Sequence, residues 1–302
     1  MVKILIGGSP CTYWSIAKTG NKFNKIDRET KPEGLGWELF LNYLIAKEKF
    51  KPDYFLYENN YSISKEIKQC ISENLGTENM CINSELVSAQ FRRREYWFNW
   101  AAVQPTDRKI SFQDIKDTDY EYCKQFKVKR TPSRERMWNG GEGRNGSHQC
   151  ANITNAVKTK AVTTKQDRSN NAGLVEFEDF CRYLTTHELE KLQTMLEGYT
   201  KAISKSLAEK ALGNGWTAEV IIYLLSVALK DIPHNEEILV LSMYDGIGTG
   251  RYCLDKLGYT NVKYFAYEID ENAKKVALDN YPDIIQMGDA FRVREDTWAL
   301  PL

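Results

Sequence analysis

The first third of the chain alternates between short apolar runs and longer periodic segments. Residues 2–6 and 54–57 are β-type runs that end in glycine or polar residues, and 37–50 between them is an apolar-rich helix candidate. After the second run, apolar residues recur every four positions and a glycine follows, at Ile63, Ile67, Ile71, Leu75 and Gly76. This spacing predicts a helix with a C-terminal stop. Strands separated by helices of this length predict a parallel α/β sheet.

The periodic pattern decays from about residue 101 and returns near residue 182. Thr185 and Glu188 have the spacing of a capping box, and Leu189, Leu192 and Leu196 follow on one face of the predicted helix. The segment GNGWT at 213–217 then leads into an apolar helix at 218–229.

The last third has the alternation of a second α/β segment. An apolar strand at 238–243 is followed directly by the glycine-rich sequence DGIGTG at 245–250. A helix at 251–257, a strand at 262–267 and Asp270 as the N-cap of another helix complete a βαβα run.

Composition excludes two classes of protein. The 302 residues carry 41 Lys and Arg against 41 Asp and Glu, and 12% are aromatic, so the chain is not expected to be disordered. The longest nearly apolar run, 220–229, has ten residues, whereas a bilayer needs about twenty. No membrane span is therefore expected.

The cysteines and histidines suggest a reducing compartment without a structural metal. Seven cysteines form no CxxC pair, which indicates reduced thiols and a cytoplasmic protein. His148 and Cys150 have no further ligands at zinc-like spacing, so no metal site is expected.

Positive charge is concentrated in one segment although the chain is neutral overall. Residues 124–168 hold eleven Lys and Arg against three acidic residues, together with Trp138 and the glycine-rich stretch 139–146. A charge run is often only a solvated loop, but this composition raises the prospect of nucleic-acid contact.

The glycine-rich segment after the 238–243 strand predicts a nucleotide-like ligand. Glycines there let the backbone approach a ligand at a helix N-terminus, and Glu268, 22 residues after Gly246, is placed to bind ribose hydroxyls. The G-x-G-x-G spacing favours S-adenosylmethionine (SAM) over NAD. Asp289 follows a third strand, where its carboxylate can accept from an adenine amino group or cap a helix.

A cysteine follows the first strand in the sequence GGSPC at 7–11. Cys11 therefore lies where open α/β sheets bind ligands, and Pro10 stiffens the turn that presents it. Glu58 and Asn59 follow the second strand at the same edge. A cysteine nucleophile and a carboxylic acid there would form a catalytic pair, although a lone cysteine is more often a buried apolar residue.

Seven motifs together resemble the motif set of DNA cytosine-5 methyltransferases. They are GGSPC (7–11), YENN (57–60), Q-x-R-x-R (90–94), RYLTTHELEKLQ (182–193), GNGWT (213–217), YDGIGTG (244–250) and GD (288–289). The local sequence is most similar to animal de novo DNA methyltransferases and to bacterial or phage relatives. The resemblance covers almost the whole chain except about 101–155, and it implies the doubly wound α/β sheet of SAM-dependent methyltransferases.

The order of these motifs is unusual for the family. Its members begin with the SAM-binding glycine motif and reach the Pro-Cys motif later, whereas here the Pro-Cys motif comes first. This predicts a circular permutation, with ends between the Asp289 strand and the Cys11 strand and with no family motif missing. Permutation is physically reasonable because a sheet needs neighbouring strands rather than a particular cut point.

The resemblance also implies a mechanism. Cys11 attacks C6 of a flipped cytosine, Glu58 hydrogen-bonds N3 and the exocyclic amine, and Arg92 and Arg94 hold O2 and orient Glu58. C5 then takes the methyl group of SAM, which leaves S-adenosylhomocysteine, and loss of the C5 proton expels Cys11. Arg93 is expected to be solvated.

The remaining expected site residues follow from the same motifs. Those expected to bind SAM are Tyr244, Asp245, Gly246, Ile247, Gly248, Thr249, Gly250, Glu268, Ile269, Asp289, Asn214, Gly215 and Trp216. Those expected to contact the nucleic acid are Ser9, Pro10, Asn59, Lys127, Lys129, Arg130 and Arg134. The expected partner is double-stranded DNA, and a cognate restriction endonuclease and the oligomeric state stay open.

The domain organisation follows from these assignments. Residues 1–100 form the catalytic half of the methyltransferase domain, 101–181 the target-recognition region, and 182–302 the remainder with the SAM-binding half. Two other functions stay open, an RNA cytosine-5 methyltransferase acting on tRNA and a catalytically silent DNA- or SAM-binding regulator. The pairing of Cys11 with Glu58 and the two arginines argues against the silent regulator.

Overall fold

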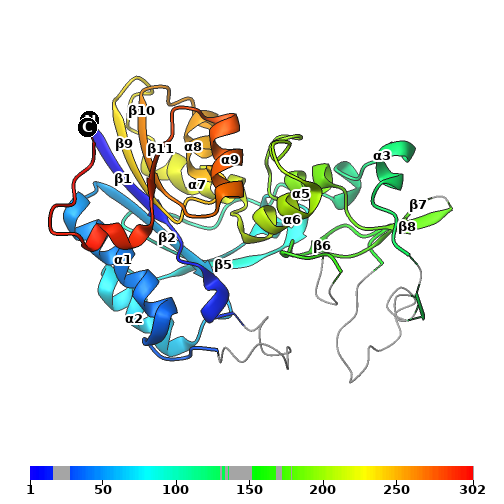
Figure 1. Cartoon of the computed structure of the whole chain (residues 1–302), viewed down its shortest axis with the longest axis horizontal. Helices are drawn as coiled ribbons and strands as arrows, with labels where there is room; N and C mark the ends of the chain where they lie inside the picture. The colour runs from blue at the N-terminus through cyan, green and yellow to red at the C-terminus, as the bar shows by residue number, and fades with distance from the viewer. Residues whose placement is uncertain are drawn as a thin grey trace. The chain divides into compact units, whose positions relative to one another are not determined.

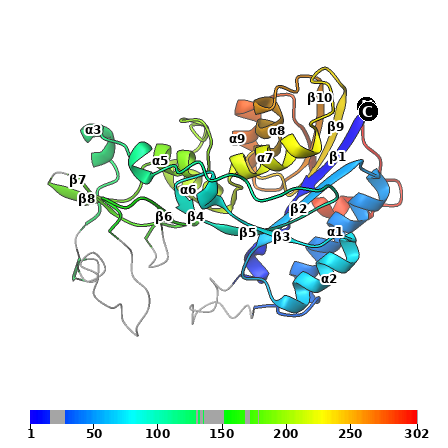
Figure 2. The ribbon, with the colours of Figure 1, turned by 180° about the vertical axis from the view of Figure 1, so that it is seen from behind.

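The apolar runs assemble into one mixed, mostly parallel sheet (Figures 1 and 2). Its strands are β1 (Val2–Gly7), β2 (Tyr54–Asn60), β3 (Met80–Asn83), β5 (Arg93–Phe98), β9 (Ile238–Met243), β10 (Val262–Tyr267) and β11 (Ile285–Gly288). They lie in the order β11-β10-β9-β1-β2-β5-β3. The strands from β11 to β2 are parallel and β5 pairs antiparallel with β2. The expected α/β class is confirmed.

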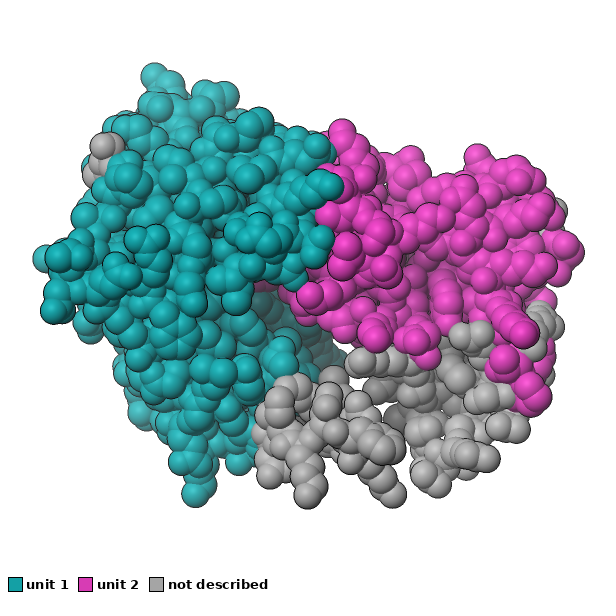
Figure 3. All heavy atoms as spheres, viewed as in Figure 1, with its two compact units in different colours: residues 1–82, 93–104, 222–302 teal, residues 83–92, 105–221 magenta. Residues whose placement is uncertain are grey.

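The computed structural model describes residues 1–15, 28–129, 131–132, 135, 152–167, 172–177 and 179–301. The chain divides into two compact units (Figure 3). Unit 1 comprises Met1–Ile82, Arg93–Gln104 and Ile222–Leu302, and unit 2 comprises Asn83–Arg92 and Pro105–Ile221. Unit 2 thus includes the RYLT and GNGWT motifs in addition to most of the expected recognition region.

Helices cover both faces of the sheet in unit 1 (Figures 1 and 2). The helices α1 (Gly34–Phe50) and α2 (Lys65–Leu75) lie on one face, and α8 (Thr249–Lys256) and α9 (Glu271–Asn280) on the other. The predicted stop of α2 is confirmed, because Ser64 Oγ accepts from the Ile67 amide at 3.2 Å and Gly76 ends the helix with a φ of 72°. A core that includes Phe40, Tyr57 and Leu241 fills one side of the sheet.

The strand order contains a topological switch point between β1 and β9. From β1 the chain passes through α1 to β2, on one side of it, whereas from β9 it passes through α8 to β10, on the other. The carboxyl ends of β1 and β9 therefore flank a crevice of the kind in which open α/β sheets bind ligands. The GGSPC and DGIGTG segments leave the sheet at these two ends.

Unit 2 contains shorter elements. They are η3 (Ser84–Leu86), β4 (Gln90–Phe91), η4 (Phe112–Asp114), α3 (Tyr120–Lys124), β6 (Thr159–Lys160), β7 (Val175–Phe177), β8 (Phe180–Arg182), α5 (Thr186–Leu192) and α6 (Lys205–Asn214). The helix α7 (Ala218–Ala228) begins in unit 2 and ends in unit 1. No single helix of the described residues is long and apolar enough to cross a membrane, although α6 and α7 taken together as a bent pair reach that length and composition.

The capping box at Thr185 is confirmed, but its helix is shorter than the leucine spacing predicts. Thr185 Oγ1 accepts from the Glu188 amide at 3.0 Å, and α5 ends at Leu192. Leu196 is 57% exposed and lies beyond the helix. The buried Glu190 carboxylate accepts from the amides of Gly198 and Thr200, each at 2.7 Å, which folds the chain into a loop there.

A buried ion pair joins β8 to α5, and we expect its loss to be costly. Arg182 donates to both carboxylate oxygens of Glu188, at 2.7 and 2.8 Å, and both side chains are fully buried. Glu188→Ala leaves the guanidinium buried without its counter-charge, so unfolding free energy should fall by about 3–5 kcal/mol in a urea titration. Glu121→Ala is the matched control, because that exposed carboxylate lies 3.8 Å from Lys124 and should matter by less than about 0.5 kcal/mol. Equal losses in the two variants would contradict the prediction.

Candidate functional site

The turn after β1 is held between its two neighbouring strands. A Cβ atom on Gly7 would lie 2.5 Å from the Met243 carbonyl oxygen of β9. A Cβ atom on Gly8 would lie 2.7 Å from the Glu58 carbonyl oxygen and 3.0 Å from Glu58 Oε2, both of β2. Only glycine permits backbones to approach this closely, so the turn runs directly beside the Glu58 carboxylate.

Ser9 and Asn59, which are expected to contact the nucleic acid, are hydrogen-bonded within this turn. The side-chain amide of Asn59 donates to the Ser9 carbonyl oxygen and to the Tyr57 hydroxyl, both at 3.1 Å, and Ser9 Oγ lies 2.6 Å from that hydroxyl. Ser9 is 4% exposed and Asn59 is 1% exposed. These hydrogen bonds hold the turn against β2.

Cys11 opens a single helical turn, η1 (Cys11–Tyr13). Its carbonyl oxygen accepts from the amides of Trp14 and Ser15, at 3.0 and 2.9 Å. Pro10 before it is exposed and has a φ of −50°, and Cys11 itself is half-buried. The thiol is thus carried by a rigid turn and is partly accessible.

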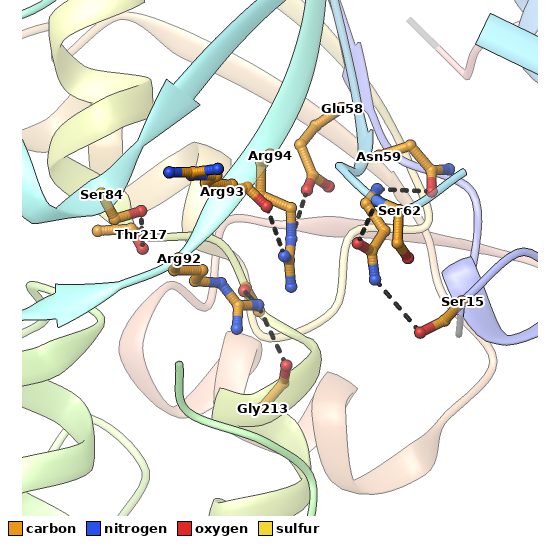
Figure 4. Close-up of polar contacts among 12 residues, drawn as sticks. Ser15, Glu58, Asn59, Ser62, Ser84, Arg92, Arg93, Arg94, Gly213 and Thr217 are labelled. Carbon is orange, nitrogen blue, oxygen red and sulfur yellow. Dashed lines mark hydrogen bonds and ion pairs between the residues drawn. The ribbon is translucent and has the colours of Figure 1, made fainter. Parts of the chain in front are cut away.

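Glu58 is paired with Arg94 across the antiparallel strands. Asn60 of β2 lies opposite Arg94 of β5, and Glu58 lies opposite Tyr96, so Glu58 and Arg94 are diagonal neighbours on one face. Arg94 Nε is 3.1 Å from Glu58 Oε1, and Figure 4 shows the two side chains pointing toward one another. The predicted orientation of Glu58 by Arg94 agrees with this contact.

Arg92 hydrogen-bonds to the backbone of unit 2. Its guanidinium donates to three carbonyl oxygens, those of Val162 at 2.8 Å, Gly215 at 2.8 Å and Gly213 at 3.1 Å, the last of which is drawn in Figure 4. The side chain is only 3% exposed. Arg92 thus fixes the backbone around the GNGWT motif. Arg93 is exposed, as expected.

The glycines of the 245–250 loop are required for more than one reason. Gly246 has a φ of 64°, and a Cβ atom there would meet open space. Gly248 has a φ of 78°, and its Cβ would lie 3.2 Å from that of Ala277 on α9. At Gly250 a Cβ would collide with Ile6 and the Tyr264 hydroxyl, at 2.2 and 2.4 Å. A side chain at Gly246 would meet no protein atom, whereas at Gly248 and Gly250 it would meet neighbouring side chains.

Glu268 reaches back to this loop from the end of β10. Its Oε2 accepts from the Gly246 amide at 2.8 Å, and its Oε1 accepts from the amides of Ile269 and Asp270 at 2.8 and 2.7 Å. Ile269 is 68% exposed beside it. This pair of side chains suits a nucleoside, because a fixed carboxylate can accept from ribose hydroxyls and an exposed apolar side chain can pack against the base.

Asp289 caps a helix, which is the alternative that the sequence left open. Its Oδ1 accepts from the Phe291 amide at 2.9 Å at the start of η5 (Ala290–Arg294). Phe291 is 37% exposed and was not among the expected residues. In the sequence, Phe291 is marked only by its aromatic side chain and its position two residues after the GD motif.

Asp245 is buried beneath the loop. Its Oδ1 accepts from the Tyr264 hydroxyl at 2.6 Å and from Ser242 Oγ at 2.7 Å. Burial raises the pKa of the Asp245 carboxyl to about 6, although these two hydrogen bonds act in the opposite direction.

The expected residues of the GNGWT motif lie in unit 2, and those of the basic segment lie in unit 2 or outside the described residues. Asn214 is the last residue of α6, and Gly215 caps it. Lys127 Nζ lies 5.6 Å from the centre of the Phe180 ring, and Lys129 is exposed. Arg130 and Arg134 fall outside the described residues, as do His148 and Cys150.

Comparison with known families agrees with this arrangement. Residues 1–90 match the family model of C-5 cytosine-specific DNA methylases. The match covers less than a third of the 302 residues. The matched stretch includes the GGSPC turn and Glu58, which the structure packs together.

The chain is also similar to solved structures. The chain is similar to the Entamoeba histolytica methyltransferase EhMeth, with 14% identity, 76% of this chain and 78% of that chain covered, and a TM-score of 0.52. It is also similar to the S. pombe Dnmt2 methyltransferase, with 17% identity, 64% and 72% covered, and a TM-score of 0.48. No curated protein sequence matches the chain. The likeness to EhMeth shows a methyltransferase fold.

The raised pKa of Asp245 predicts how the stability of the protein depends on pH. An unfolded aspartate has a pKa near 3.9, so between pH 4 and 6 the folded protein binds a proton that the unfolded chain has lost. Stability therefore falls as pH rises through this window. Asp245→Asn should remove that loss and gain about 2 kcal/mol over wild type between pH 4 and pH 7, measured by urea unfolding at each pH. A difference between the two proteins that does not change with pH would contradict the raised pKa.

Proposed function

We propose that this chain transfers a methyl group from SAM to C5 of a cytosine flipped out of DNA, through a covalent bond between Cys11 and C6. The observation that supports this most is the packing of the Cys11 turn against Glu58, within the stretch that matches the methylase family. Cys11 supplies a nucleophile on a rigid turn, and Glu58 supplies a carboxyl group held by Arg94.

The chemistry follows from these groups. Cytosine C5 is a poor nucleophile, so the Cys11 sulfur first adds to C6 and pushes electron density toward C5 and N3. Glu58, as the carboxylic acid, donates its proton to N3 and so neutralises the charge that develops there, while Arg94 holds the carboxyl group in one orientation. C5 would then take the methyl group of SAM, with S-adenosylhomocysteine as the leaving group. After methylation, loss of the C5 proton restores the double bond and expels the Cys11 thiolate. The base must leave the duplex to reach this site.

The residues around the 245–250 loop fit SAM as the methyl donor. Gly246 leaves open space beside a left-handed backbone, Glu268 presents a fixed carboxylate at the same place, and Ile269 exposes an apolar side chain. Glu268 would bind the ribose and Ile269 would cover the adenine. SAM supplies an electrophilic methyl group when bound.

DNA is the substrate that the sequence favours. The matching family is described as DNA methylases, and unit 2 contains the described part of the basic segment 124–168. An RNA cytosine-5 methyltransferase is the second candidate, because the same fold and chemistry would serve on tRNA. A catalytically silent regulator would not need Cys11 beside a Glu58 carboxyl group that Arg94 holds in place.

We also propose that the chain is a circular permutant of the family. Its first strand, β1, lies between β9 and β2, so the Pro-Cys and glycine motifs are neighbours although they come from opposite ends of the sequence. The segment after η5 ends beside the start of β1 in both views (Figures 1 and 2). A chain with the usual order of motifs would need only a short connection between the segment after η5 and the start of β1.

A covalent trap tests the mechanism. Duplex DNA with 5-fluorocytosine at the target should form a SAM-dependent adduct that survives denaturing electrophoresis, because fluorine replaces the proton that must leave. Cys11→Ser should abolish the adduct, since a hydroxyl is a far weaker nucleophile. Cys70→Ser is the matched control, because Cys70 lies on α2 away from the GGSPC turn, and it should leave trapping unchanged.

The same assay separates the candidate substrates. An adduct on fluorinated tRNA and none on DNA would move the function to RNA. SAM binding without an adduct on either nucleic acid would overturn the catalytic proposal and favour a regulator. Sequencing of trapped genomic DNA would also give the recognition site.

A carboxylate substitution tests the cofactor site. Glu268→Ala should weaken SAM binding by about 1–3 kcal/mol in calorimetry, through lost bonds to the ribose and a less constrained Gly246 amide. Glu271→Ala, three residues on, is the control, because that exposed carboxylate pairs with Lys274 and its loss should leave affinity unchanged. Wild-type affinity in Glu268→Ala would remove this residue from the cofactor site.

A further inference from the structure

Tyr244 has an unusual backbone conformation at the start of the 245–250 loop. Its φ is 63°, and among the described residues it is the only aromatic residue with a positive φ. A bulky side chain in this left-handed region costs free energy and persists only where surrounding contacts hold it. Such strain is common at ligand-binding loops, so the contacts of Tyr244 are informative.

The hydroxyl of Tyr244 is bonded to helix α1. It donates to the Leu39 carbonyl oxygen at 2.7 Å and accepts from the side-chain amide of Asn42 at 3.3 Å. Asn42 is fully buried, and its Oδ1 accepts from Arg294 Nε at 2.5 Å. Arg294 also donates to Glu38 Oε2 at 2.7 Å. One phenolic oxygen therefore joins the loop after β9 to α1, and Asn42 extends the network to η5.

The start of α1 is in turn fixed to the segment that follows Cys11. The Glu29 carboxylate accepts from the Gly36 amide at 3.1 Å and from Trp14 Nε1 at 3.0 Å. A Cβ atom on Gly36 would lie 2.5 Å from Trp14 Nε1, so helix and indole are in direct contact. Trp14 is fully buried, and its amide bonds to the Cys11 carbonyl oxygen. The N-terminus of helix α1 thus contacts the Cys11 turn through Trp14. About one helical turn further on, the same helix contacts Tyr244.

We propose that the Tyr244 hydroxyl is a positioning group, which holds the cofactor loop in register with the Cys11 turn through helix α1. The inference rests on the proposed function, because it takes the 245–250 loop as the SAM site. Burial raises the pKa of Tyr244, so the hydroxyl stays protonated and remains a donor at every working pH. A phenylalanine would keep the packing of the ring and lose both hydrogen bonds.

The test uses Tyr244→Phe with Tyr43→Phe as the matched control. Tyr43 lies on helix α1 and is fully buried. Its hydroxyl donates to the Leu5 carbonyl oxygen of β1 and not to the 245–250 loop. Calorimetry with S-adenosylhomocysteine should show affinity about five- to tenfold weaker for Tyr244→Phe, as expected for a lost buried hydrogen bond. Tyr43→Phe should differ from wild type by less than twofold.

Amide hydrogen exchange gives a readout that a purely structural role would not change. Saturating S-adenosylhomocysteine should slow exchange in the first turns of α1 in wild type and in Tyr43→Phe. In Tyr244→Phe the ligand should bind without slowing it, because the connection between loop and helix is missing. The ring volume is conserved in both variants, so both should fold, as circular dichroism can verify.

Two results would overturn the inference. If Tyr244→Phe binds the ligand as wild type does and α1 is still protected, the hydroxyl does not position the loop, and the proposed function stands. If wild type does not bind S-adenosylhomocysteine at all, the proposed function fails and this inference fails with it.

Discussion

The site depends on one steric constraint, the close approach of three backbones at the carboxyl edge of the sheet. Gly7 lies against the Met243 carbonyl of β9, and Gly8 lies against the Glu58 carbonyl of β2. Any side chain at either glycine would force the strands apart. Because the two contacts are on opposite sides of one turn, they place the Cys11 turn, the Glu58 carboxylate and the start of the 245–250 loop at the switch point together.

The polar groups at this edge are held by hydrogen bonds and ion pairs within the protein. Asn59 and Tyr57 hold Ser9, Arg94 holds Glu58, and backbone amides hold Glu268. Each of these bonds removes a rotational freedom that binding would otherwise have to freeze, which is how a site becomes preorganised. Some polar side chains of the motifs, such as Ser9 and Asn59, therefore form hydrogen bonds within the protein.

The sequence predicts the elements of the sheet well, but it does not reveal the contacts that the motif residues make. The spacing that ends at Gly76 and the runs at 238–243 and 262–267 correspond to α2, β9 and β10, because each depends on local periodicity and capping. The antiparallel pairing of β5 with β2 was not predicted, since the spacing of elements carries no information on strand direction. That pairing is what brings Arg94 to Glu58. Arg92, two residues earlier, precedes the strand and belongs to unit 2, and the motif alone does not reveal this boundary.

Long-range pairing has a consequence for how the site forms. Strands β1 and β9 pair over six positions, from Val2 with Ile238 to Gly7 with Met243, so this pairing joins two segments from opposite ends of the sequence. Contacts of such large sequence separation must overcome the entropy of closing the chain between them. The Cys11 turn and the 245–250 loop leave the sheet at the same end of this pair. The two segments therefore lie side by side only where β1 and β9 are paired, so their arrangement depends on this long-range contact.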